Sequence, residues 1–60
     1  DMRIYAVGRT LYVENTGGDY RVYTATGQLV YAGDESMVLL PGAGVYIVCA
    51  GDRSQRVLVE

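Results

Sequence analysis

The chain has 60 residues, a net charge of −2, five Arg, no Lys and no His. This length allows one domain, residues 1–60, with a small core. Too few basic residues are present to attract nucleic acid, and no apolar run reaches the roughly 18 residues that span a membrane. No charged-then-apolar leader precedes the first apolar run, so we expect no signal peptide in this segment.

Short apolar runs alternate with Gly, Asp and Ser along the whole chain, which is typical of an all-β domain. β-branched residues and tyrosine dominate these runs, as they do on pleated surfaces. No window has helical periodicity over the roughly 11 residues that a helix requires. The pattern predicts seven short strands, at residues 3–7, 10–15, 20–25, 28–32, 37–40, 45–50 and 55–59.

The strongest local prediction is a hairpin between the third and fourth strands. Ala25, Thr26 and Gly27 form its turn, with Gly27 at the position where a type I turn followed by a bulge needs a left-handed residue. Seven strands of this length favour a small antiparallel β-sandwich with Greek-key, immunoglobulin-like connections, and a partly open barrel is the alternative. The alternation of apolar and polar residues predicts these inward positions: Ile4, Leu11, Val13, Val22, Val30, Leu39, Tyr46, Val48, Val57 and Val59.

The sequence offers no constellation for catalysis. Most of the carboxylates fall in predicted turns or at a chain end, where solvated side chains are the rule, and no base is present to activate Thr or Ser. Calcium and zinc ligand patterns are missing, so we expect no metal and no cofactor. Cys49, the single cysteine, is expected to be a small apolar residue of a strand. We therefore expect a protein that is not an enzyme.

Four of the tyrosines occur at staggered positions on successive predicted strands. If they share one face, they form an exposed aromatic surface that could bind sugar or protein. The alternative is that they form cross-strand pairs that cover a thin sheet, which we favour. The four residues are Tyr5, Tyr12, Tyr23 and Tyr31.

Three segments, in this order, resemble the C-terminal sorting domain of the type IX secretion system of Bacteroidetes. They are VYTATGQLVY at 22–31, LLPGAGVYIV at 39–48 and QRVLV at 55–59, and the resemblance covers residues 20–60. It implies a seven-stranded β-sandwich, in agreement with the strands read from the pattern. The motif positions that it implies are Gly27, Val30, Gly44, Tyr46, Val57 and Val59. We expect these positions to act through structure, as turn glycines and core residues.

The resemblance implies a function as the C-terminal module of a larger secreted protein. Such a module directs its cargo domain, which lies upstream, from the periplasm through the outer membrane. Its partners are then the secretion machinery and a cell-surface sortase, which removes the module and joins the cargo to lipopolysaccharide. Two alternatives stay open: an accessory sandwich that binds carbohydrate or protein, and a structural spacer. Association of two copies by edge strands is a further alternative, since so small a core gains from burial in a dimer.

Overall fold

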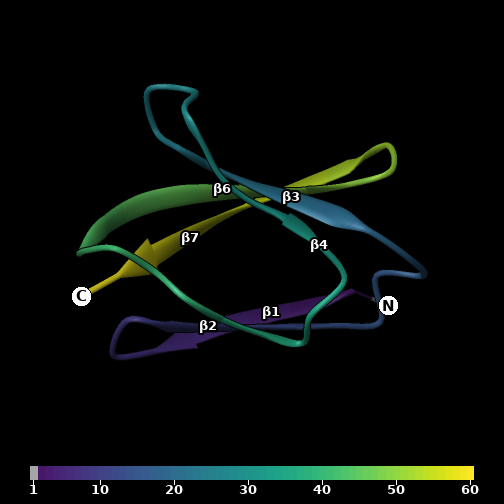
Figure 1. The fold of residues 1–60 in the computed structure, drawn as a ribbon, viewed down its shortest axis with the longest axis horizontal. Helices are drawn as coiled ribbons and strands as arrows, with labels where there is room; N and C mark the ends of the chain where they lie inside the picture. The colour runs from purple at the N-terminus through teal and green to yellow at the C-terminus, as the bar shows by residue number, and fades with distance from the viewer. Residues whose placement is uncertain (1) are drawn as a thin grey trace.

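The computed structural model describes residues 2–60, which form seven strands in two packed antiparallel sheets (Figure 1). One sheet has three strands in the order β1-β2-β5, and the other has four strands in the order β4-β3-β6-β7. The strand bounds are β1 Arg3–Val7, β2 Thr10–Glu14, β3 Tyr20–Thr24, β4 Leu29–Gly33, β5 Met37–Leu39, β6 Gly44–Ala50 and β7 Arg53–Val59. Within the described residues the sheets do not close into a barrel, which confirms the predicted β-sandwich.

The chain passes between the sheets three times. The hairpins β1–β2, β3–β4 and β6–β7 each stay within one sheet, so the connections β2–β3, β4–β5 and β5–β6 must cross. Sequence order and sheet order therefore differ, as in Greek-key sandwiches. At one side of the molecule β1 of the first sheet lies against β7 of the second.

The core lies between the two sheets. Alternate residues along the strands point into it. Four side chains are fully buried there: Leu11, Val22, Val48 and Val59. The complete set of buried apolar residues is Leu11, Val13, Tyr20, Val22, Val38, Leu40, Tyr46, Val48, Ala50, Val57 and Val59. Burial of these side chains is the main source of stability, because apolar surface contributes about 25 cal/mol per Å² removed from water.

The prediction for Leu39 is wrong: its side chain is 78% exposed, while Val38 and Leu40 point inward. The reason is the pairing between β2 and β5, in which Val38 lies opposite the buried Leu11. Residues directly opposite each other in a ladder share a face, so this register fixes Val38 inside and Leu39 outside. Ile4 and Val30, also expected inside, are half-buried and pack against the core.

Candidate functional site

The β3–β4 hairpin forms as predicted, with Gly27 at φ +93°. The Gly27 amide donates to the Thr24 carbonyl at 2.9 Å, and the Thr24 amide donates to the Gln28 carbonyl at 2.8 Å. The Thr24 hydroxyl also accepts from the Gln28 amide at 3.1 Å. A bulge follows in the ladder, because Tyr23 pairs with Leu29 while its neighbour Val22 pairs with Tyr31, two positions further along β4.

Four of the six motif positions form two directly opposed cross-strand pairs. Gly44 lies opposite Val59, and Tyr46 lies opposite Val57, where β6 and β7 run side by side. Tyr46, Val57 and Val59 are buried. The remaining two positions, Gly27 and Val30, belong to the β3–β4 hairpin and its bulge, so all six lie in the four-stranded sheet or its turns.

Gly44 needs to be glycine because of its backbone rather than because of its neighbours. Its φ is +143°, and a Cβ built there would meet no atom within 4 Å. We expect Gly44→Ala to lower the free energy of unfolding by about 1 to 3 kcal/mol, as for other side chains forced into this region. Gly42→Ala, at a neighbouring glycine without positive φ and with the same open space, should change stability by less than about 0.5 kcal/mol. Urea unfolding of both variants measures the difference, and equal losses would show that φ is not the cause.

The four tyrosines singled out in the sequence do not share a face, so they do not form the single aromatic surface that was the less favoured of the two alternatives. Tyr5 and Tyr12 lie opposite each other on the outer face of the three-stranded sheet, with rings stacked at 5.0 Å and an interplanar angle of 15°. The Arg3 guanidinium lies over the Tyr5 ring, 5.5 Å from its centroid. This is the cross-strand pairing that the sequence analysis favoured over a four-tyrosine surface, and it uses two of the four residues.

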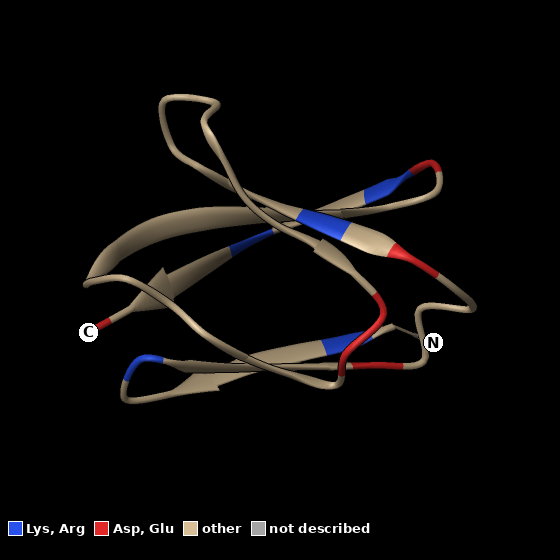
Figure 2. Ribbon diagram, in the orientation of Figure 1, with Lys and Arg blue, Asp and Glu red and all other residues tan. Residues whose placement is uncertain are grey.

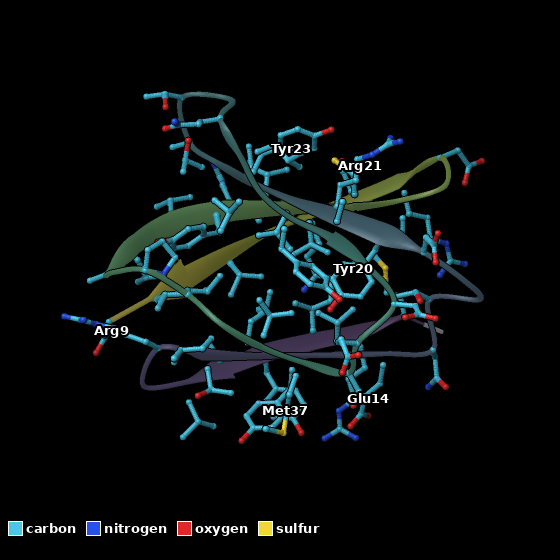
Figure 3. All side chains as sticks on the ribbon, in the orientation of Figure 1. Arg9, Glu14, Tyr20, Arg21, Tyr23 and Met37 are labelled. Atoms are coloured by element: carbon cyan, nitrogen blue, oxygen red, sulfur yellow. The ribbon has the colours of Figure 1, made fainter. Side chains whose placement is uncertain are left out.

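The other two tyrosines lie elsewhere. Tyr23 lies on the outer face of the four-stranded sheet, on the opposite side of the molecule from Met37, which neighbours Tyr12 (Figure 3). Tyr31 faces the interior, where it lies opposite the buried Val22 and packs against the core. The bulge is the physical reason, since one extra residue in β4 shifts the alternation and turns Tyr31 to the inner face.

Two tyrosines hold the β4–β5 crossing by their hydroxyl groups. Tyr20, 2% exposed, donates from its hydroxyl to the Glu35 carbonyl. The Tyr31 hydroxyl accepts from the Glu35 amide at 3.0 Å. The two rings lie 5.5 Å apart at 44°, so they pack together, and Figure 3 shows Tyr20 between the two sheets. Phenylalanine at both positions would fill the same space, but the carbonyl and the amide of Glu35 would lose these hydrogen-bond partners.

A third tyrosine holds the β5–β6 crossing in the same way. The hydroxyl of Tyr46 donates to the Gly42 carbonyl at 2.7 Å, while its ring fills the core. Three of the six tyrosines thus combine a hydrogen bond to a chain crossing with a ring that is buried in the core, as in Tyr20 and Tyr46, or packed against it, as in Tyr31. Sequence reasoning missed Tyr20, although its alternation with Arg21 and Val22 in β3 carries the signal.

Burial raises the pKa of the Tyr20 hydroxyl from 10.0 to about 12, and the nearby Tyr31, Glu35 and Asp34 add to the effect because their negative forms repel a phenolate. The raised pKa favours the neutral phenol, which can donate a hydrogen bond. Tyr20 therefore keeps its bond to the Glu35 carbonyl throughout the neutral pH range.

One shallow hollow of about 340 Å³ lies at the end of the four-stranded sheet, among residues 2–60. Its wall includes Asp19, Arg21, Ala32 and the half-buried thiol-bearing Cys49. Its other lining residues are Tyr20, Gly33 and Gly51. Arg21 and Cys49 are direct cross-strand neighbours, so they share the outer face of the sheet.

Residues 2–60 contain no group of three or more Cys, Asp or Glu side chains placed to hold a metal ion. In the same residues, no helix is long and apolar enough to cross a membrane. Every buried side-chain nitrogen or oxygen in the described part of the chain has a hydrogen-bond partner. The hydroxyl groups of the inward-facing tyrosines thus form hydrogen bonds to the chain crossings.

Comparisons with protein-family models, with curated proteins and with solved structures found no match to this chain.

Proposed function

We propose that this domain is a non-catalytic sorting module, which directs a larger secreted protein across an outer membrane to the cell surface. The observation that carries the proposal is the pairing of Gly44 with Val59 and of Tyr46 with Val57. Residues from two separate segments of the sorting-domain pattern meet in one ladder. If the secretion machinery recognises a folded shape, the sequence pattern must specify that shape, and these pairs are an example of how it would do so.

On this proposal the partners are the secretion machinery and a surface sortase, and the cargo is a domain that precedes the module in its parent protein. The β-sandwich fold and the structural positions of all six motif residues support it. The competing hypothesis of a carbohydrate-binding face made by four tyrosines loses the arrangement that it needed, since Tyr5 and Tyr12 lie on one sheet, Tyr23 on the other, and Tyr31 inside.

The test is a fusion of the domain to the C-terminus of a fluorescent reporter that carries a periplasmic signal peptide. It is produced in a Bacteroidetes strain with the type IX system and in a strain that lacks it. We expect protease-accessible reporter at the surface of the first strain and periplasmic reporter in the second. A reporter that stays periplasmic in both strains contradicts the proposal.

A matched pair of variants shows whether folding of the module is required. Val57→Ala opens a cavity at a buried motif position and should lower surface reporter, whereas Leu39→Ala, at a residue of the three-stranded sheet that is 78% exposed, should not. Equal export of both variants would mean that the pattern is not read through the fold.

A further inference from the structure

The outer face of the four-stranded sheet combines exposed apolar residues with arginines. Its central row crosses all four strands and consists of Leu29, Tyr23, Ile47 and Arg56, which are successive ladder partners. Val45 and Leu58 form the row on one side, and Arg21 and Cys49 lie in the row on the other. We call this surface the Arg–Tyr face, defined as Arg21, Tyr23, Leu29, Val45, Ile47, Arg56 and Leu58.

Charge is segregated on this sheet. Its four strands contain Arg21, Arg53 and Arg56 but no Asp or Glu, although the whole chain is negative. The carboxylates that flank these strands lie outside them, at the ends of the sheet, as Asp19, Asp52 and Glu60 do (Figure 2). Protein-binding surfaces are typically enriched in Tyr and Arg and depleted of Lys, Glu and Asp, and the Arg–Tyr face has this composition.

We propose that the Arg–Tyr face is the surface by which the domain binds its secretion machinery, on a protein surface that is apolar at its centre and bears carboxylates opposite Arg21 and Arg56. This inference rests on the proposed sorting function and names the recognition surface for it. Tyr23 and Ile47 lie between the two arginines and form the apolar centre of the contact.

The arginines of this surface argue against a second copy of the chain as its occupant. Two copies packed through the Arg–Tyr face would bring arginines together with no carboxylate from these strands between them. Like charges held close at an interface disfavour association. The chemistry of the surface thus favours an acidic partner over self-association.

The outer face of the three-stranded sheet is a poorer match to an acidic partner, because it carries charges of both signs. It carries both Arg3 and Glu14, directly opposite each other. Its two tyrosine rings cover one another, and Arg3 covers Tyr5. This face, on which Met37 lies exposed beside the stack, therefore provides the matched control.

The reporter fusion described above tests the inference through two double variants. Tyr23→Ser with Arg56→Glu changes the Arg–Tyr face and should lower surface reporter about tenfold or more, the effect expected when a binding hot spot is lost. Tyr12→Ser with Arg3→Glu changes the opposite face and should keep export near the original amount. Tyr23→Ser with Arg56→Lys should export more reporter than Tyr23→Ser with Arg56→Glu, because the positive charge returns. Urea unfolding of the purified domains confirms that the two faces are compared at similar stability.

The outcomes separate the two proposals. A fusion that is not exported even without substitutions overturns both the sorting function and the docking surface. Normal export of the Tyr23/Arg56 variant, or an equal loss from the variants of both faces, overturns the docking surface alone. Sedimentation of the domain with vesicles of anionic phosphatidylglycerol tests whether the Arg–Tyr face binds a membrane instead of a protein. Binding that the Tyr23/Arg56 substitutions abolish would overturn a protein partner.

Cys49 allows a direct footprint, because it is the single cysteine and lies half-buried on the same face. Outer-membrane fractions from the secreting strain should slow alkylation of Cys49 by a maleimide, and fractions from the strain without the system should not. A thiol on the opposite face, Met37→Cys in a Cys49→Ser background, should react at the same rate with both fractions. Protection of the Met37 position in place of Cys49 would place the contact on the wrong sheet and overturn the inference.

Discussion

Replacing Leu11 with alanine is expected to lower the free energy of unfolding by about 2 to 5 kcal/mol, the range found for a leucine deleted from a packed core. Leu11 has no exposed surface and lies on the central strand of its sheet, between β1 and β5. A core in a chain this short rarely supplies more than about 3 to 5 kcal/mol. The variant should therefore lose a large share of the stability of the domain at 25 °C.

The measurement is the near-ultraviolet circular dichroism of the tyrosines, followed as a function of urea. Leu39→Ala is the control, because the same side chain is deleted there from a site that is 78% exposed. We expect it to change stability by less than about 0.5 kcal/mol. Comparable losses at Leu11 and Leu39 would contradict the observed register of β5 against β2.

Raising the pH is expected to destabilise the domain through Tyr20. Its folded pKa of about 12 lies above the value of 10.0 that it has when exposed. The neutral phenol is thus favoured in the folded state, and its contribution is complete below pH 10 and is lost as the pH rises from 10 to 12. By linkage the loss amounts to about 2 kcal/mol at pH 11.5.

Urea unfolding at pH 8, 10 and 11.5 measures this loss. Tyr20→Phe should be less stable at pH 8, by roughly 1 kcal/mol for the missing hydrogen bond to Glu35, and should lose less stability between pH 10 and 11.5. Tyr23→Phe removes a hydroxyl from the outer face and should retain the full alkaline loss. A Tyr20→Phe variant with an unchanged alkaline loss would show that another group is responsible.

The sequence predicts those parts of the fold that depend on local chemistry. The turn at Gly27 could be predicted because a left-handed residue at a fixed position in a hairpin admits few alternatives. The inward positions of Leu11, Val13 and Val22 could be predicted because polar residues alternate with apolar ones in or beside their strands.

The sequence analysis is wrong where residues distant in sequence decide which side chains point inward or which strands pair. Met37–Leu39 and the following Leu40 form an unbroken apolar run, so nothing local says which residues point inward, and the pairing with β2 decides. The inward turn of Tyr31 depends on a bulge against β3, which the alternation within β4 does not show. The separation of Tyr23 from Tyr5 and Tyr12 depends on which strands share a sheet. This is a property of the whole topology, and short strands do not encode it individually.

The pairing of the two outermost strands has a mechanical consequence. β1 bonds only to β2, from Arg3 opposite Glu14, and β7 bonds only to β6, from Val59 opposite Gly44. A pulling force applied at Arg3 or at Val59 would load these ladders at their open ends, so that hydrogen bonds would break one after another. Such peeling requires less force than shearing all bonds together. A motor that drew the chain into a narrow channel from either side could thus unravel the domain strand by strand.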